Sequence, residues 1–339
     1  MATTGRSKGR MLGGIVFDHR EINTYAADVE YYFQRYGDIE LHRRMIADRW
    51  RTDAFARAIE AVVTPEDVVL DVGTGTGVLA MLAARAGARQ VYAIDQAEVA
   101  QTAANLVKAN KLGDVVKILR GPAAELELPE SATVLVSEWL GNFAFVEAML
   151  DDVLAARDAN LAPGGRMIPS RVRTLLAPLD DSALFFSEGP GFWRKDVRGL
   201  DFSSLEAIEL QQGRANQFRV DTGSLLCPGV TMTDLDLDTA TSEAPFGEGV
   251  VHFEIERDGV LNGVAGWFEA QLAEDVWLDT GPHEPETHWA QTYMPCAPRP
   301  VKAGDRLEVG YALTRDPEEP RYLLLELTLD EERHTYRLE

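Results

Sequence analysis

A glycine-rich turn is the clearest chemical feature of the sequence. Gly73, Gly75 and Gly77 follow the short apolar run 68–72, and a helical pattern of apolar residues begins directly after them. Such a turn lets the backbone approach a ligand closely, and the first amides of the following helix favour negative charge. Asp95 ends the next apolar run, where a carboxylate can accept hydrogen bonds from both hydroxyls of a ribose. These residues predict a site for a nucleotide-like cofactor.

The spacing of the glycines separates the possible cofactors. Val78 stands where a dinucleotide-binding turn would have its third glycine, and the sequence has no GxxxxGK stretch of the P-loop type. The GxGxG spacing is instead similar to the glycine loop of class I S-adenosylmethionine methyltransferases. Taken singly, the glycines could form a purely structural turn and Asp95 could cap a helix, but their combination favours a cofactor site.

Two glutamates form the second chemical feature. Glu138 follows the strand-like run 133–137, and Glu147 lies nine residues further on, beyond a loop that contains Gly141. Ligands of α/β proteins bind at the carboxyl ends of the strands, so both carboxylates can converge on one substrate. A carboxylate pair suits a guanidinium or another nitrogen cation, and a carboxylate can also accept the proton released on alkylation. Alternatively, Glu147 merely faces solvent from a helix.

The elements that must position these residues alternate in the first half of the chain. Helical periodicity covers residues 24–62 and returns after the glycine turn. Strand-like runs at 68–72, 91–95, 115–119 and 133–137 alternate with helical stretches that include 99–110 and about 145–160. This alternation predicts a doubly wound, Rossmann-like parallel sheet of the α/β class, preceded by N-terminal helices.

The second half of the chain has a different pattern. After Pro163-Gly164-Gly165, β-type segments follow at 172–179, 250–256, 264–272, 307–313 and 321–329, many with alternating apolar residues. They predict an antiparallel barrel or sandwich, with a hairpin turn at Asp258-Gly259. An aromatic patch in the irregular stretch between the first two segments predicts an interaction arm and consists of Phe185, Phe186, Phe192 and Trp193. The expected domains are a flexible N-terminal arm (1–23), helices with the cofactor-binding sheet (24–168), and a β-barrel domain (169–339) whose dimerisation arm lies at about 183–210.

Composition limits the class of protein. The chain has 339 residues, of which 45% are hydrophobic, so it can bury a sizeable core, and its net charge of −22 argues against nucleic acid or an anionic membrane as a partner. No apolar run reaches the roughly 18 residues of a membrane span. The two cysteines lack paired spacing, which fits a reducing cytoplasm, and the histidines show no metal-binding spacing, so we expect no metal.

Five ordered motifs give the chain its family resemblance. They are YFQRY at 32–36, LHRRMIADRWRT at 41–52, VLDVGTGTG at 69–77, SEWLG at 137–141 with EAML at 147–150, and THW at 287–289. In this order they resemble the motifs of the protein arginine methyltransferases, over roughly residues 30–339. The resemblance implies a Rossmann-like domain followed by a β-barrel with a dimerisation arm, so that a homodimer or higher homo-oligomer is expected.

The resemblance also implies a cofactor and its contacts. The cofactor would be S-adenosyl-L-methionine, with S-adenosyl-L-homocysteine as the product. The residues implied to bind it, with Arg51 at its carboxylate and Glu125 near the adenine, are Arg51, Asp71, Gly73, Gly75, Asp95, Glu125 and Met45.

The acceptor side follows from the same resemblance. Glu138 and Glu147 would hold the acceptor nitrogen, with His288 paired to Asp48 as a further catalytic pair. Tyr32 and Tyr36 would close over the site, and the residues implied to shape the acceptor space are Met45, Met149, Asn142 and Trp289. Considered without the motifs, the tyrosines and methionines would be core residues and His288 an ordinary satisfied histidine.

One departure from the family pattern affects the expected substrate. Asn142 and Phe143 stand where the family usually has a tyrosine after the glycine. With the bacterial-looking excess of arginine over lysine, this departure favours a small nitrogen-containing acceptor (an indole, amine or guanidine) of bacterial specialised metabolism. The alternative is an arginine-containing peptide, as in a protein arginine N-methyltransferase acting on Arg/Gly-rich segments. A third possibility is a non-catalytic module that only binds the cofactor.

Overall fold

A parallel sheet with helices on both faces forms the first part of the molecule. The structure, a computed structural model, describes residues 39–213 and 215–339, so the expected arm 1–23 and both Tyr32 and Tyr36 lie outside the described residues. The sheet has the order β3-β2-β1-β4-β5 and consists of β1 (Val68–Val72), β2 (Gln90–Asp95), β3 (Val116–Arg120), β4 (Ala132–Val136) and β5 (Leu161–Ile168). The predicted doubly wound sheet is thus confirmed.

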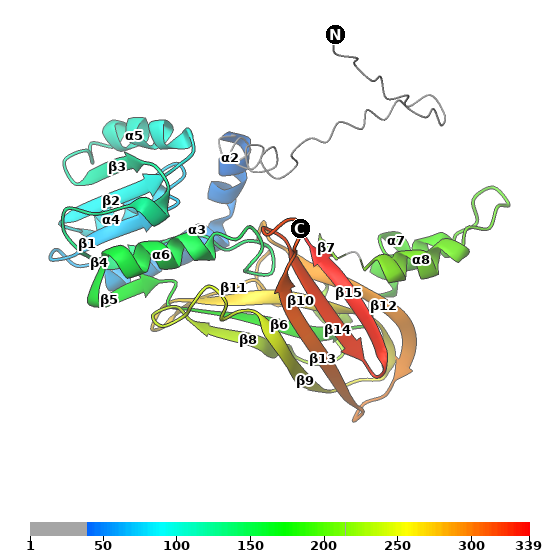
Figure 1. The fold of residues 1–339 in the computed structure, drawn as a ribbon. Coiled ribbons are helices and arrows are strands. Elements are labelled where there is room, and N and C mark those ends of the chain that lie inside the picture. The colour runs from blue at the N-terminus through cyan, green and yellow to red at the C-terminus, as the bar shows by residue number, and fades with distance from the viewer. Residues whose placement is uncertain (1–38, 214) are drawn as a thin grey trace, which may run out of the picture.

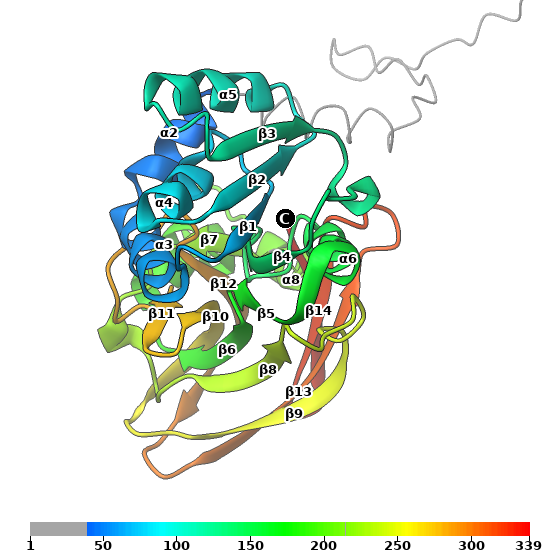
Figure 2. The same cartoon turned by 90° about the vertical axis from the view of Figure 1, so that its left-hand side faces the viewer.

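Helices cover this sheet in the manner of a three-layer α/β fold. Figure 2 shows α3 (Arg49–Val62), α4 (Val78–Ala86) and α5 (Val99–Ala109) on one face, with α6 (Leu150–Asn160) on the other. Helix α2 (Ile39–Ala47) precedes α3. Strand β1 is buried at every position, as expected for a central strand that both helical layers cover. Strands β1, β2 and β3 follow one another toward one edge of the sheet, whereas β4 and β5 lie on the other side of β1. The carboxyl ends of β1 and β4 therefore flank the switch point at which such folds bind ligands.

Antiparallel sheets form the second part. One has the order β7-β12-β10-β6-β8, with β11 paired to β10, and the other has the order β15-β14-β13-β9. The first contains β6 (Arg171–Leu179), β7 (Asn216–Phe218), β8 (Val230–Asp236), β10 (Gly259–Ala273), β11 (Val276–Asp279) and β12 (Gln291–Val301). The second contains β9 (Gly247–Glu254), β13 (Arg306–Arg315), β14 (Leu323–Leu329) and β15 (Glu332–Leu338). The predicted antiparallel β-domain is confirmed (Figure 1).

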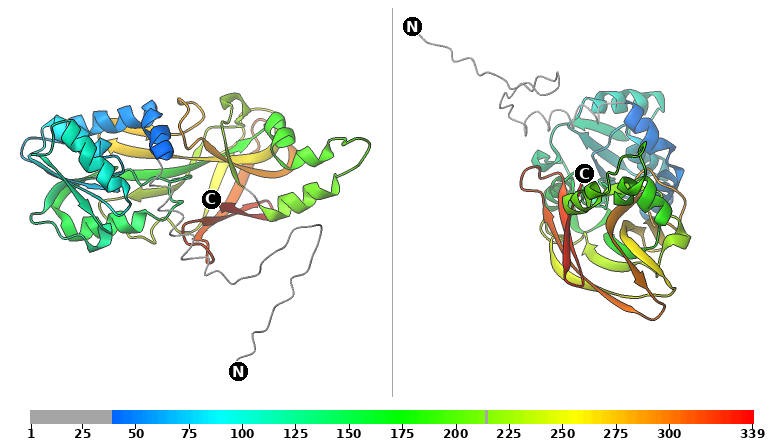
Figure 3. Two further views of the ribbon diagram at one scale, coloured as in Figure 1. Left: turned by 90° about the horizontal axis from the view of Figure 1, so that it is seen from above. Right: turned by 90° about the vertical axis from the view of Figure 1, so that its right-hand side faces the viewer.

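Helices between β6 and β7 project from the β-domain as an arm. They are α7 (Ser182–Ser187) and α8 (Ser204–Gln212), with a short 3-10 turn at Pro190–Arg194 between them. Figure 3 shows this arm at the end of the molecule opposite the parallel sheet. The arm exposes apolar side chains, namely Phe186, Phe192, Val197, Leu200, Phe202 and Ile208. Of the expected aromatic patch, Phe185 is instead buried at the base of the arm.

Two local predictions are wrong, and one strand forms where none is predicted. Helix α6 begins at Leu150 and not near residue 145, because the preceding loop includes Phe143, Ala144, Glu147 and Ala148 at positive φ. Asp258-Gly259 does not form a hairpin: β9 pairs with β13 whereas β10 pairs with β6 and β12, so the turn joins two different sheets. Residues 161–168 form β5, which the Pro-Gly-Gly sequence concealed. No helix among the described residues is long and apolar enough to cross a membrane.

Candidate active site

A cavity of about 260 Å³ opens at the carboxyl ends of β1, β2 and β4. The glycine turn forms one wall, where the backbone amides of Gly73 and Thr74 both donate to Ile94 O, at 2.9 and 3.0 Å. Gly73, Gly75 and Gly77 all have positive φ, and a Cβ at Gly75 would lie 2.9 Å from the ring of His42. The turn therefore requires glycine both for its backbone conformation and for close packing.

Asp95 lies in the wall of this cavity beside the glycine turn. Its Oδ2 accepts a hydrogen bond from Gly75 N at 2.9 Å, and its Oδ1 accepts one from Ala97 N at 2.8 Å. Burial raises the pKa of the Asp95 carboxyl, although these hydrogen bonds oppose the shift. A carboxylate at this strand end can still accept hydrogen bonds from ribose hydroxyls, so the residues present fit an adenosyl group.

Two residues expected at the cofactor do not line the cavity. Asp71 is fully buried in β1 behind the turn, where its Oδ2 accepts from Thr74 Oγ1 at 2.6 Å and from Ala80 N at 3.0 Å. It holds the turn and the start of α4 rather than facing a ligand. Glu125 lies in another groove beside β2 and β3, while Ala123, two residues earlier, lines the 260 Å³ cavity. Because the glycine turn and Asp95 fit an adenosyl group, we call the 260 Å³ cavity the cofactor cavity.

The two glutamates do converge. Glu138 and Glu147 line the cofactor cavity and also a smaller adjoining cavity of about 90 Å³. The methionines Met45 and Met149 line both cavities as well. These four side chains therefore lie where the larger cavity meets the smaller one, which is the position that a group passing between two bound molecules must occupy.

Glu138 is held by an ion pair with Arg51. The Nε and Nη2 atoms of Arg51 donate to Glu138 Oε2, at 2.8 and 2.6 Å, and Leu140 N donates to Oε1 at 3.1 Å. Both charged side chains are more than nine-tenths buried. A buried, charge-assisted pair of this kind fixes the orientation of both groups. Arg51 also lines the cofactor cavity, as expected.

Asp48 joins the N-terminus of α3 to the loop that carries His288. Its Oδ1 accepts from Arg51 N at 3.0 Å and so caps the helix, while its Oδ2 accepts from His288 N and lies 2.8 Å from His288 Nδ1. Burial alone would raise the pKa of Asp48, but the hydrogen bonds from His288 and Arg51 outweigh burial and lower it. The expected Asp48–His288 pair is therefore present in the structure.

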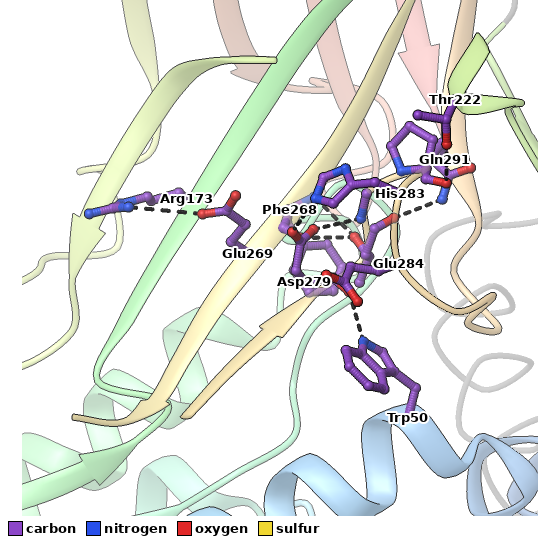
Figure 4. A network of polar contacts seen from close by, with 12 residues as sticks. Trp50, Arg173, Thr222, Phe268, Glu269, Asp279, His283, Glu284 and Gln291 are labelled. Carbon is purple, nitrogen blue, oxygen red and sulfur yellow. Dashed lines mark hydrogen bonds and ion pairs between the residues drawn. The ribbon is translucent and has the colours of Figure 1, made fainter. Parts of the chain in front are cut away.

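The loop that carries His288 is anchored on both sides. Trp289 Nε1 donates to Leu140 O at 2.7 Å, which connects this loop to residues 138–147, which we call the glutamate loop. On the other side, Trp50 Nε1 of α3 donates to Asp279 O at the end of β11, at 3.0 Å (Figure 4). Both His288 and Trp289 line the smaller cavity, as the motif resemblance implied.

Figure 4 shows a network of polar contacts around the end of β11 and the turn that follows it. Ligand-type atoms of Asp279, His283 and Glu284 lie within 4.8 Å of one another. His283 Nε2 is 2.8 Å from Asp279 Oδ2, so these two side chains already satisfy each other. The group lies apart from both cavities and adds nothing to the site; that the reaction needs no metal stays a prediction.

Only one of the two departures from the family motif reaches the acceptor side. Asn142 lines the smaller cavity, but its Nδ2 donates to the backbone oxygen of Glu339 at 3.0 Å. Phe143 is buried against the β-domain, where a Cβ at Gly266 would lie 2.5 Å from its ring. The substitution that suggested a different acceptor therefore changes the cavity wall at one residue only.

Sequence reasoning did not single out three residues that line the cofactor cavity: His42, Asp152 and Arg321. His42 and Asp152 lie within or next to the recognised motifs, so their neighbourhood could have pointed to them. Arg321 comes from the loop between β13 and β14, far along the chain, and no local signal marks it.

This fold and this site define a class I S-adenosylmethionine-dependent methyltransferase. The sequence matches the arginine methyltransferase oligomerization subdomain over residues 175–333 and a ribosomal protein L11 methyltransferase model over residues 51–172. It is 34% identical to protein arginine N-methyltransferase 1 of Schizosaccharomyces pombe over 317 residues, with 86% of this chain and 91% of the relative covered. It is 33% identical to protein arginine N-methyltransferase 6 of Xenopus tropicalis, with 86% and 88% covered.

Solved structures agree. The Trypanosoma brucei PRMT1 enzyme–prozyme heterotetrameric complex with AdoHcy superposes with a TM-score of 0.83 at 28% identity, covering 90% of this chain and 99% of that one. Arabidopsis thaliana protein arginine methyltransferase 10 gives a TM-score of 0.78 at 29% identity, covering 91% and 100%. The chain belongs to the protein arginine N-methyltransferase family, and its cofactor is S-adenosylmethionine.

These findings correct the expected substrate. The relatives that match along most of the chain are protein arginine N-methyltransferases, so a small-molecule acceptor of bacterial specialised metabolism is the wrong expectation. The physical reason lies in the two residues that differ from the family motif. Phe143 packs into the β-domain, and Asn142 donates a hydrogen bond to Glu339 O. The findings favour the alternative that the sequence left open.

Proposed function

We propose that this protein transfers a methyl group from S-adenosylmethionine to a guanidinium nitrogen of arginine in Arg/Gly-rich protein segments. The observation that carries the proposal is the position of Glu138 and Glu147, which line the cofactor cavity and the adjoining smaller cavity together. The strongly acidic chain, with a net charge of −22, adds long-range attraction for arginine-rich segments.

Holding and polarising the acceptor is the main task of these residues. S-adenosylmethionine, when bound, would supply an electrophilic methyl group on a sulfonium: a bond from the acceptor nitrogen to the methyl carbon would form as the carbon–sulfur bond breaks in line with it, and S-adenosylhomocysteine would leave as the neutral thioether. A guanidinium is a poor nucleophile because its pKa exceeds about 12. Glu138 and Glu147 would localise the positive charge on one nitrogen and leave the lone pair of another directed at the methyl group, so positioning provides most of the catalysis.

The remaining residues would support this arrangement. Arg51 would bind the cofactor carboxylate while it orients Glu138, and Asp95 would hold the ribose. His288, held by Asp48, would line the acceptor side and accept the proton that leaves the methylated nitrogen. Met45 and Met149 would enclose the space through which the methyl group passes.

Substitution of each glutamate tests the proposal. We expect Glu138→Gln and Glu147→Gln each to lower kcat/KM for an Arg/Gly-rich peptide by about 100-fold or more, because charge localisation on the acceptor is lost. Methyl transfer from labelled S-adenosylmethionine would be measured, with products identified by mass. Glu130→Gln is the matched control, since that carboxylate pairs with Arg89 on the surface. Full turnover by either site variant would contradict the proposal.

We also propose that the protein acts in the cytoplasm as a homodimer or higher homo-oligomer that assembles through its arm. The exposed apolar residues of the arm support the oligomer, as does the match to a family oligomerization subdomain. Cys227 and Cys296 are both free and buried, which fits a reducing compartment. The domain boundary we propose, after residue 168, is supported by the end of β5 at Ile168 and the start of β6 at Arg171.

A further inference from the structure

The second glutamate of the site is held from the β-domain. The backbone amide of Glu147 donates to the carbonyl oxygen of Arg321, which lies in the loop between β13 and β14, at 2.6 Å. Glu147 and Ala148 have φ of +87° and +59°. Residues other than glycine keep such a conformation only where their surroundings impose it. The contact with Arg321 is therefore part of what gives the glutamate loop its shape.

The Arg321 side chain reaches the same site. It lines the cofactor cavity together with Glu138 and Glu147. Its Nε and Nη2 donate to the two carboxylate oxygens of Glu319, at 3.0 and 3.2 Å, in the two-pronged geometry that arginine forms with a carboxylate. The hydrogen bond from Arg321 lowers the pKa of Glu319. Both side chains are largely buried, so Glu319 holds in place the arginine that lines the cavity.

Glu319 is anchored in turn through Asp316. The Oδ1 atom of Asp316 accepts from Glu318 N at 2.8 Å and from Glu319 N at 3.4 Å, and its Oδ2 accepts from Arg337 Nε of β15 at 2.6 Å. Burial would raise the pKa of Asp316, but the hydrogen bonds from the loop amides and the charge of Arg337 lower it. A continuous set of contacts thus runs from β15, through loop 316–322, to Glu147.

We propose that loop 316–322 is a positioning element for methyl transfer, with Arg321 as the residue through which it fixes Glu147. This inference rests on the proposed function, because it assigns the loop to the glutamate that holds the acceptor. An uncompensated arginine would repel a cationic acceptor from this cavity. Glu319 cancels that charge, so Arg321 and Glu319 act as one unit: one orients the glutamate loop and the other keeps the wall nearly neutral.

Substitutions in the loop test this inference on the full chain. Arg321→Ala keeps the backbone carbonyl that accepts from Glu147 N but removes the side-chain pair with Glu319 that holds the loop in place. We therefore expect kcat for an Arg/Gly-rich peptide to fall by about 30-fold, because small displacements of a positioning group are costly. Arg321→Lys should recover only part of the rate, since lysine cannot form the two-pronged contact. Glu319→Gln should mainly raise the KM of the cationic peptide, by about 10-fold, and most strongly at low salt.

Controls separate positioning from a general loss of structure. The affinity for S-adenosylhomocysteine, measured by calorimetry, should stay within about 3-fold in Glu319→Gln, and in Arg321→Ala, whose side chain lines the cofactor cavity, it should fall far less than kcat does. Arg333→Ala removes another arginine of the β-domain, one that pairs with Glu326 and lies outside both cavities, and its kinetics should match the wild type.

A double-mutant cycle gives the decisive result. In a Glu147→Asp background, Arg321→Ala should cost less than about 3-fold, because its effect passes through Glu147. The same loss in both backgrounds, or a kcat for Arg321→Ala equal to the wild type, would overturn the inference. Failure of the proposed function is distinguishable, since it would appear as full peptide turnover by Glu147→Gln whatever the loop variants do.

Discussion

Asp71 shows how a residue of a functional motif can act through the fold alone. Its carboxyl is fully buried, and burial raises its pKa to about 7, although Thr74 and Ala80 donate to it. Among the described residues, its Oδ1 has no hydrogen-bond partner. Below pH 7 the folded protein therefore binds a proton that the unfolded chain, with a pKa near 4, has already released.

This difference predicts a pH dependence of stability. Because the folded state holds the extra proton, the free energy of unfolding falls as the pH rises toward 7 and levels off above it. Between pH 5.5 and 7.5 the contribution of Asp71 amounts to roughly 2 kcal/mol. Urea unfolding of the wild type and of Asp71→Asn should show that the wild type loses about this much more stability over that range. Parallel pH profiles would mean that Asp71 does not titrate there.

At the scale of the element, the glutamate loop depends on one glycine for a reason other than backbone freedom. A Cβ at Gly141 would lie 2.1 Å from Val146 O, so Gly141→Ala must displace the loop segment that carries Glu147. We expect kcat/KM for an arginine peptide to fall by about 100-fold or more, while S-adenosylhomocysteine affinity changes little. Gly113→Ala is the matched control, because nothing lies within 4 Å of its Cβ. Normal turnover by Gly141→Ala would show that the loop tolerates the displacement.

The same loop marks the limit of sequence reasoning. The glycine turn and Asp95 could be predicted because strand, turn and helix are contiguous and each leaves a local pattern. The start of α6 could not, since the irregular loop before it is shaped by a hydrogen bond to Arg321, 174 residues away. Pairing of β9 with β13 was likewise invisible, because which strands pair is decided by the packing of the whole β-domain.

At the scale of the whole molecule, neither part of the chain forms the site alone. The parallel sheet supplies the glycine turn and Glu138, whereas the β-domain supplies His288 and Arg321. Hydrogen bonds from Trp50 to Asp279 O and from Trp289 to Leu140 O fix the position of the two parts relative to each other. The geometry of the two adjoining cavities therefore depends on how the two parts pack together, and anything that stabilises the β-domain also stabilises this geometry.

A second copy of the chain that binds to the arm would stabilise the β-domain from outside, and the arm is the surface best suited to this contact. Its exposed apolar residues include Phe192 at 40% and Leu200 at 61% exposure, and leaving such a cluster in water is unfavourable. We expect Phe192→Asp combined with Leu200→Asp to convert the protein to monomers, measured by light scattering, because the charges cannot be buried in an interface. Val250→Asp is the matched control, since Val250 is also exposed, at 51%, but lies on β9 away from the arm. If the arm steadies the β-domain, the monomeric variant should also bind S-adenosylhomocysteine more weakly than the control. An unchanged solution mass for the double variant would show that the arm is not the contact between copies.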